Sequence, residues 1–591
     1  MEHRGKYPLI GILLAVASIA FAGQKAAPAP AANTAFDRVV DQVIAREAEN
    51  SKALRGYSPL VETYLQSMKA DPEVGMVPVN DQYYLTRAGF RSKTLVDVNF
   101  HAQPGFLSRA MHDVKKPFRT EFVADGFNWM MTLDMRGMDR QHYNFDYQGR
   151  EFLGDVRCIV IDVTPKPHDS SGRFMGRVWV EDKDYNIVRF NGTFASSLRT
   201  QYLHFDTWRL NMAPGLWLPA YIYSEDLEPA HAKRRTGNYK AETRIWGYNV
   251  VSGHAENEFT EVLVDDASAV KDNSDKAQDL PPVAAERAWQ RQAEDNVIER
   301  LERGGLLART GEVDHVLNTV INNLEITNNI DIQPEVRCRV LLTSPIESFT
   351  MGHTIFVSRG LLDVLPDEAS LAAILALQLS HIVLGHPTDT SFAYKDRSIV
   401  SDQQLLARMH FTRTQAEERE ADTKALALLQ NSPYHDKLDS VGLFLRQVDA
   451  RRSTLPHLIR SDMGNSLTTG GGGDMRLKEL TKSAPKLEPK KITQVAALPL
   501  GGRITVDPWN NRIEINKSKP IQLLTAREKM PLEVTPVFPH LTRFSEGTPA
   551  EAAKPGEDSK SANPAAAPAP VAAPVAAPAP AAVANDAAAG K

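Results

Sequence analysis

The segment ALQLSHIVLGHP, residues 376–387, holds part of a metal-binding pattern. A catalytic zinc site on a helix places two histidines four residues apart, and a glutamate beside the first histidine takes a proton from the zinc-bound water. His381 stands at the second histidine position, but Leu377 stands at the first and Gln378 at the glutamate position. Leu377 has no lone pair, and the neutral amide of Gln378 accepts no proton. The segment therefore predicts a site without one ligand and without its catalytic base.

A second polar run, EEREADTKALALL, follows downstream. Within it, Glu418 and Asp422 lie four residues apart, about one helical turn. Taken alone, such a run of acids is more often a solvated helix face. His386 lies about 140° around the helix from the retained histidine, so we do not expect it on the same face. His410 and His435 stay open as substitutes, although a lone histidine is more often structural.

Three segments, SPIESFTMGHTIFVSRGLLDVL, DEASLAAILALQLSHIVLGHP and EEREADTKALALL, resemble in this order the M48 family of zinc metallopeptidases. The resemblance implies a mainly helical, zincin-like domain over residues 286–482. It also implies that His381 and Glu418 are metal ligands with Asp422 behind them, and that Leu377 and Gln378 mark a degenerate site. Two protein ligands hold zinc weakly, so we expect zinc to bind weakly or not at all.

An N-terminal region must precede this domain. From Phe36 to about Ala70 apolar residues recur at helical spacing, and LVETYLQSMKA is predicted as a second helix. Alternating segments up to Val264, such as VRCIVIDVTP, predict antiparallel strands. In GRVWVEDKDYNIVRFNG a hairpin is expected to set two pairs of residues opposite each other. These are Val178 and Val180 against Val188 and Phe190.

The order of a helix, ETYLQ, a meander with GRVWVEDKDYNIVRFNGTF, and the strand LWLPAYIYSE resembles the LolA-like outer-membrane lipoprotein-sorting fold. The resemblance implies a curved antiparallel half-barrel over residues 36–264 that shelters acyl chains or other apolar ligands. The alternative is a generic antiparallel sheet packed on its own helices, because a fold alone does not give a function.

The remaining segments have compositions that build no large core. Basic residues followed by the apolar run Leu9 to Ala22 predict a signal peptide over residues 1–22, and an Ala/Pro linker follows over residues 23–35. Residues 265–285 are a second linker, and residues 545–591 an Ala/Pro tail that we expect to be disordered. Between them, residues 490–544 are a small β segment. Its hairpin RITVDPWNNRIEI sets Ile504 and Val506 against Ile513 and Ile515.

The charged residues of the chain bear on which kinds of binding partner are expected. Lys and Arg number 68 against 73 Asp and Glu, a formal charge of -5, which argues against nucleic acid bound by bulk charge. Because of the predicted signal peptide, the mature chain is expected to be exported, to the periplasm or cell envelope. Beyond this peptide no apolar stretch is long enough to cross a membrane. The two cysteines, Cys158 and Cys338, lie in apolar runs, which favours buried thiols over a disulfide.

The sequence thus predicts an α+β multidomain protein: a LolA-like sheet, a mainly helical M48-like domain, a small β segment and a disordered tail. We expect a catalytically inactive, exported M48-like protein that binds polypeptides or lipoproteins. Two alternatives stay open. One is an active zinc-dependent metalloendopeptidase of envelope protein quality control that recruits its missing groups from elsewhere. The other is a carrier of acyl chains or lipoproteins through the sheet, with the helical domain as scaffold.

Overall fold

The computed structural model describes part of the chain. The described residues are 34–71, 75–89, 96–99, 127–167, 170–195, 204–226, 238–248, 282–387, 411, 413–459, 463–464, 467–468, 475–484, 486, 504–507, 512–515 and 539–544. All of them belong to the first of two units, Met1–Phe544 and Ser545–Lys591. The predicted signal peptide, the first linker up to residue 33, most of the second linker, His410 and the tail lie outside the described residues. The end of the second linker is instead helix α5 (Pro282–Arg303).

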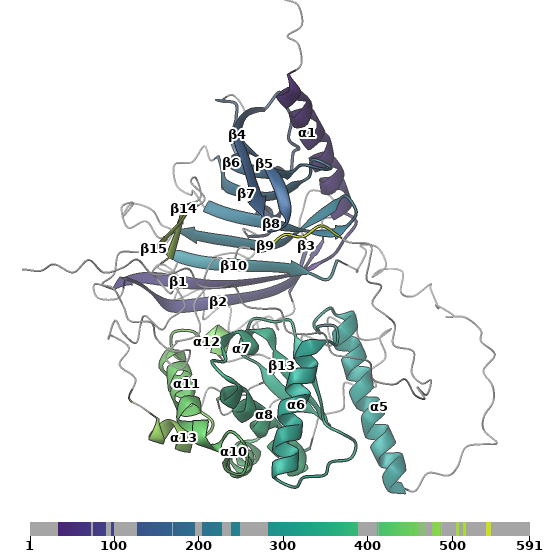
Figure 1. The fold of residues 1–591 in the computed structure, drawn as a ribbon, viewed down its shortest axis with the longest axis vertical. Coiled ribbons are helices and arrows are strands. Elements are labelled where there is room, and N and C mark those ends of the chain that lie inside the picture. The colour runs from purple at the N-terminus through teal and green to yellow at the C-terminus, as the bar shows by residue number, and fades with distance from the viewer. Residues whose placement is uncertain are drawn as a thin grey trace, which may run out of the picture. The chain divides into compact units, whose positions relative to one another are not determined.

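The N-terminal region forms one antiparallel sheet, which in the described residues has ten strands in the order β3-β2-β1-β10-β9-β8-β7-β6-β5-β4 (Figure 1). Within those residues the sheet is open, because β3 and β4 are its two ends. The bounds are β1 Leu60–Asp71, β2 Gly75–Gly89, β3 Val96–Asn99, β4 Tyr143–Leu153, β5 Val156–Pro165, β6 Phe174–Glu181, β7 Ile187–Phe194, β8 His204–Ala213, β9 Leu216–Asp226 and β10 Tyr239–Trp246. The predicted open antiparallel sheet is confirmed.

Helix α1 (Ala35–Leu54) packs against β7 and β9 of this sheet (Figure 1). Its start is fixed by a capping box, in which Thr34 Oγ1 accepts a hydrogen bond from the Asp37 amide and the Asp37 carboxylate accepts one from the Thr34 amide. Val40 and Val43 are buried, as the helical spacing predicted. The helix therefore covers part of one face of the sheet with its apolar stripe.

The prediction of a second helix in LVETYLQSMKA is wrong, because these residues form β1. The strand pairs with β10 on one side and β2 on the other, so it lies inside the sheet. Both of its faces are buried: Leu60 and Tyr64 join the core on one face, Val61 and Leu65 the core on the other. A strand buried on both faces loses the simple polar–apolar alternation, which is why its sequence could be read as helical.

The predicted hairpins are present, with one register error. Val178 lies opposite Phe190, but Val180 lies opposite Ile187 and not Val188, because a bulge shifts the register after Trp179. In the short β14–β15 pair (Ile504–Asp507 and Arg512–Ile515), Ile504 pairs with Ile515 and Val506 with Ile513, as predicted.

The described residues between 282 and 486 form a mainly helical region around a small sheet of order β11-β13-β12. Its elements are α5, α6 Glu312–Thr327, β11 Arg337–Leu341, β12 Ser348–Met351, β13 Thr354–Ser358, α7 Arg359–Val364, α8 Glu368–Val383, α10 Gln415–Gln430, η4 His435–Lys437, α11 Leu438–Arg451, α12 Pro456–Ile459 and α13 Lys478–Ser483. The architecture is α+β, as predicted.

The sheet and the helical region share one apolar core. A buried ion pair lies at their contact: Arg244 Nε donates to Glu62 Oε2 at 3.0 Å, and the Ser344 amide donates to Glu62 Oε1 at 2.6 Å. Tyr83 OH also donates to Glu62, at 2.9 Å. Because β1 and β10 supply the ion pair and Ser344 comes from the helical region, this cluster ties the two regions together.

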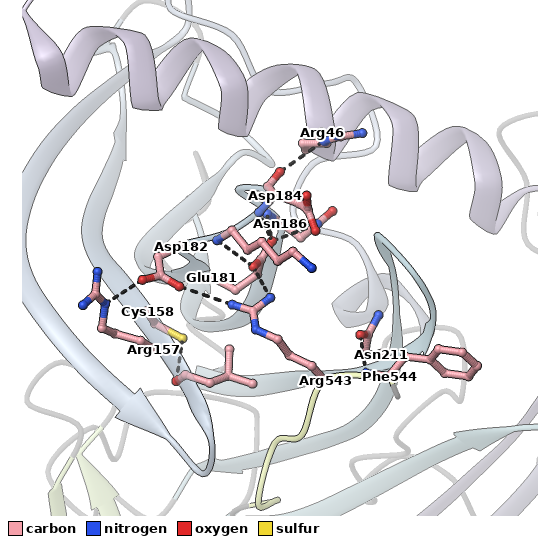
Figure 2. A network of polar contacts seen from close by, with 12 residues as sticks. Arg46, Arg157, Cys158, Glu181, Asp182, Asp184, Asn186, Asn211, Arg543 and Phe544 are labelled. Carbon is pink, nitrogen blue, oxygen red and sulfur yellow. Dashed lines mark hydrogen bonds and ion pairs between the residues drawn. The ribbon is translucent and has the colours of Figure 1, made fainter. Parts of the chain in front are cut away.

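Residues 540–544, here called the C-terminal strap, lie against the sheet (Figure 2). The Asp155 amide donates to the Leu541 carbonyl at 2.8 Å, and Leu541 is fully buried. Arg543 pairs with Glu181 at 2.6 Å, and the Phe544 amide donates to Asn211 Oδ1 at 2.7 Å. A chain segment far from the sheet in sequence thus becomes part of its surface.

Both cysteines are free and buried, which confirms the prediction of thiols. Burial, with the nearby charges of Glu181 and Asp182, raises the pKa of the Cys158 thiol to about 12.

Among the described helices, none is both long enough and apolar enough to span a bilayer.

Candidate functional site

Helix α8 carries the residues of the degenerate zinc pattern. Asp367 caps it by accepting a hydrogen bond from the Ser370 amide at 2.8 Å. Leu377 is packed in the apolar core, and Gln378 is buried with its Nε2 donating to the Ser348 carbonyl of β12 at 3.3 Å. The amide at the former base position is therefore used to hold α8 against the small sheet.

The expectation that His386 would lie away from His381 is wrong. The two Nδ1 atoms are 2.8 Å apart, and His386 Nε2 lies 3.4 Å from Glu420. Helix α8 ends at Val383, and Gly385 takes a φ of +65°, so the chain turns back and the helical angle no longer applies. Burial, with the charges of Arg476 and Arg413 and neighbouring His386, lowers the pKa of His381 to about 2.

Helix α10 packs against α8 and carries the other two predicted residues. Glu418 is buried. Asp422 forms an ion pair with Arg476 at 2.5 Å, and Arg476 Nη2 also donates to the Glu418 carbonyl at 3.2 Å. The Arg476 side chain is only 1% exposed. A fixed guanidinium therefore lies beside the predicted ligand set, and sequence analysis did not single it out.

Two of these residues make contacts other than those predicted for a zinc site. Leu377 offers no donor, and Asp422 is already bound to a cation. A divalent metal near Arg476 would be repelled by its charge. Within the part of the chain that is described, no group of three or more His, Cys, Asp or Glu side chains is placed to hold a metal.

The edge of the small sheet beside α8 is covered as well. All four residues of β12 are buried, and the Phe349 ring stacks on Phe411 at 4.3 Å and on Phe356 at 4.9 Å between ring centroids. A Cβ added at Gly464 would lie 2.4 Å from the Phe349 ring, so that segment approaches closely. An extended polypeptide binds a sheet by pairing with an exposed edge, and β12 does not offer one.

A second candidate site, here called the α1 pocket, has a volume of about 940 Å³. It lies between the C-terminal half of α1, the segment around η1 (Trp129–Met131), the turn at Gly172 and the end of β7. The apolar side chains that line it are Leu54, Trp129, Met135, Met138 and Phe194. Trp129 is 44% exposed, while the neighbouring Met130 and Met131 are buried in the core.

The segment that presents Trp129 is tied to the sheet. Thr207 Oγ1 of β8 donates to the Met130 carbonyl at 2.8 Å. Asp134 accepts hydrogen bonds from Tyr143 OH at 2.6 Å and from Arg173 at 2.7 Å. These hydrogen bonds fix the segment that carries Trp129, and so they hold Trp129 at the pocket although its own side chain is partly exposed.

Sequence analysis missed this pocket, although FNWMMTLDMRGM gave a signal. Four of the chain's 15 methionines fall in this segment beside a tryptophan, and methionine and tryptophan are enriched at adaptable apolar binding surfaces. Without the fold, however, nothing placed this segment next to α1.

No family model matches the chain, and no curated protein matches it. Among solved structures, a DUF1329 family protein from Desulfovibrio piger matches with a TM-score of 0.21 and 10% identity, covering 38% of this chain and 97% of that chain. A domain from Vibrio parahaemolyticus, described as an outer membrane lipoprotein-sorting protein, matches with a TM-score of 0.20 and 12% identity, covering 35% of this chain and 92% of that chain. Likenesses of this strength leave the function to be argued from the α1 pocket and from the residues of α8 and α10.

Proposed function

We propose that this chain is an exported, non-catalytic binding protein whose α1 pocket takes up the acyl chain of a lipid or of a lipidated protein. The observation that carries the proposal is the exposed Trp129 over an apolar pocket of about 940 Å³. Pockets for small ligands are typically about 300–1,000 Å³ and mainly apolar. Each methylene group buried there contributes about 0.8 kcal/mol, so a long acyl chain would bind well.

The helical region then acts as a scaffold. Gln378 supplies no general base, Leu377 supplies no ligand, and Arg476 brings a positive charge to the same place. We therefore do not propose peptidase activity. Binding of unfolded polypeptides along β12 is not proposed either, because that edge is buried.

The test is binding of a fatty acid to the delipidated chain without its predicted signal peptide. A fluorescent long-chain fatty acid should saturate at one equivalent and be displaced by unlabelled palmitate. Trp129→Ala should weaken binding by about three- to tenfold, because covering the exposed 44% of this side chain gains roughly half of the about 1.5–3 kcal/mol that full burial of a large apolar side chain contributes. Trp289→Ala is the matched control, since Trp289 is 58% exposed on α5 and does not line the pocket.

A second variant fills the pocket without removing anything from the core. Ala48 lies exposed on α1 and lines the pocket, so Ala48→Trp should block the fatty acid while leaving the free energy of unfolding within about 0.5 kcal/mol. If the wild-type chain binds no fatty acid, or if Ala48→Trp and Trp289→Ala bind equally well, the proposal is wrong.

A further inference from the structure

The residues that line the α1 pocket include unequal numbers of basic and acidic side chains. Five ionisable residues line it: Glu47, Lys52, Arg55, Asp134 and Arg136. Three of the five are basic, so the question is whether the two acids neutralise them.

Both acids are already paired with arginines outside this set. Glu47 accepts two hydrogen bonds from Arg209, at 2.6 and 2.8 Å, and both side chains are buried. Asp134 is shared by two arginines: it pairs with buried Arg173 at 2.7 Å, and its Oδ1 lies 4.0 Å from Arg136 Nε. With Arg173 and Arg209 counted, five basic side chains lie around these two acids, so the acids of the pocket do not balance its basic residues.

The other acids of α1 are also paired with arginines. Asp37 and Asp41 both bind Arg140, at 3.1 and 2.6 Å, and Glu49 binds Arg46 at 2.7 Å. The positive charge along the end of α1 is thus not balanced from the same helix.

The three basic residues lie at solvent-exposed positions of the pocket. Lys52 and Arg55 are exposed and three residues apart, so they share one side of the helix. In the part of the chain that is described, neither has an acidic partner within ion-pair distance. Arg136 is 47% exposed, and its Nη2 donates to the Ser171 carbonyl at 2.6 Å, which fixes its guanidinium at the pocket. A helix C-terminus favours a basic residue such as Lys52, but this does not account for Arg55 and Arg136 beside the same pocket.

Resting on the proposed function, we infer that the ligand is an amphiphile with an anionic head group, whose chain lies against Trp129 and whose carboxylate or phosphate is bound by Lys52, Arg55 and Arg136. Guanidinium groups match both anions with paired hydrogen bonds. A free fatty acid and an anionic phospholipid share this chemistry.

The test compares ligands that have the same chain and different head groups, using the delipidated chain without its predicted signal peptide. Palmitate is paired with hexadecanol, and palmitoyl lysophosphatidylglycerol with palmitoyl lysophosphatidylcholine. We expect the anionic member of at least one pair to bind roughly tenfold more tightly at low salt. The difference should shrink at about 0.5 M salt, where exposed charges are screened. The pair with the larger difference identifies the carboxylate or the phosphate as the head group.

The variant Lys52→Gln/Arg55→Gln/Arg136→Gln should bind the anionic ligands no better than the neutral ones, and the neutral ones as the wild type does. The control, Arg150→Gln/Lys183→Gln/Lys437→Gln, removes the same charge from exposed positions outside the pocket and should keep the preference. Lys52→Glu/Arg55→Glu leaves the Arg136 anchor intact and should lower anionic binding further.

Two outcomes separate this inference from the proposed function. If neutral and anionic ligands bind equally in the wild type, or if the control variant loses the preference as well, the head-group inference is overturned while acyl-chain binding stands. If neither kind of ligand binds, the proposed function itself fails.

Discussion

Arg476 determines the charge at the contact between α8 and α10. Its guanidinium holds Asp422 and reaches the Glu418 carbonyl, and its charge acts on His381. A residue that lies far along the chain from the pattern thus supplies a permanent cation where the pattern would call for a metal. Restoring the two missing residues is therefore not expected to restore the metal site.

Our first prediction concerns zinc. The variant Leu377→His/Gln378→Glu should hold clearly less than one zinc per chain after dialysis, measured by elemental analysis. Adding Arg476→Met should strengthen zinc binding by on the order of tenfold or more, because a nearby positive charge opposes a divalent ion by several kcal/mol at an effective dielectric constant of about 20. Arg476→Met alone is the control. One zinc per chain in the first variant, with Arg476 in place, would contradict this account.

At the scale of elements, the turn between β6 and β7 connects α1 to the C-terminal strap (Figure 2). On one side, Arg46 donates to the Asp184 carbonyl at 3.1 Å and Asn50 to Asn186 at 2.9 Å. On the other side, Glu181 accepts from the Asn186 amide at 3.1 Å and from Arg543 at 2.6 Å. The strap thus supports the turn that holds the pocket helix.

Our second prediction is that loosening the strap exposes Cys158. Arg543→Ala removes the partner of buried Glu181, and Gly154→Ala would put a Cβ 2.5 Å from the Leu541 amide nitrogen at a φ of +65°. Either variant should raise the rate of Cys158 labelling by roughly tenfold, because the reagent gains access and solvent entry reduces the burial that contributes most to the raised thiol pKa. In Arg543→Ala this outweighs the loss of the Arg543 charge, which by itself lowers the pKa. Cys338 in the helical region is the internal reference. Equal acceleration at both cysteines would indicate general loosening and refute a local strap.

Our third prediction concerns the effect of low pH on the contact between Glu181 and the strap. Burial alone would raise the pKa of Glu181, but hydrogen bonds from the Asn186 amide and from Arg543 outweigh it and leave the pKa below its ordinary value. The stability that Glu181 contributes is therefore present above its unfolded pKa of about 4.3 and is lost as the pH falls through the lower folded value.

The ratio of Cys158 to Cys338 labelling, measured with a disulfide reagent that reacts in acid, should therefore rise below about pH 4. In Glu181→Gln the ratio should be high already at about pH 6 and change little with acid, since nothing remains to titrate there. A wild-type ratio that stays flat down to about pH 3 would rule the mechanism out.

For the whole molecule, the sheet and the helical region are stabilised by one shared core and by the cluster of Glu62, Arg244 and Ser344. Further links run from Arg87 to the Gly304 carbonyl at 2.8 Å and from Trp246 to the Gly305 carbonyl at 2.8 Å. Regions joined in this way are expected to unfold together.

Our fourth prediction is that Glu62→Ala lowers the free energy of unfolding by about 3–5 kcal/mol, because it leaves buried Arg244 without its partner. The matched control is Asp162→Ala, which removes the partner of half-buried Arg177 within the sheet and should cost about 1 kcal/mol or less. Urea unfolding followed by circular dichroism measures both. Equal costs, or a separate early transition of one region in the wild type, would contradict a shared core.

The sequence alone determined the features that depend on local pattern. The apolar stripe of α1, the alternating strands, the β14–β15 register and the two buried thiols all follow from spacing along a few neighbouring residues. That Leu377 offers no metal ligand and Gln378 no general base could also be read directly, since it depends only on which atoms those side chains carry.

Features that depend on contacts between residues far apart in the sequence were revealed only by the tertiary structure. LVETYLQSMKA became a strand because β2 and β10 pair with it on both sides, and His386 reached His381 because the helix ends before it. Arg476 lies beside α10, and Trp129 lies at the α1 pocket, because of contacts with segments far away in the chain. Long-range pairing and packing outweigh local preference in each case, because burial on several sides stabilises more than the weak intrinsic tendency of a short segment.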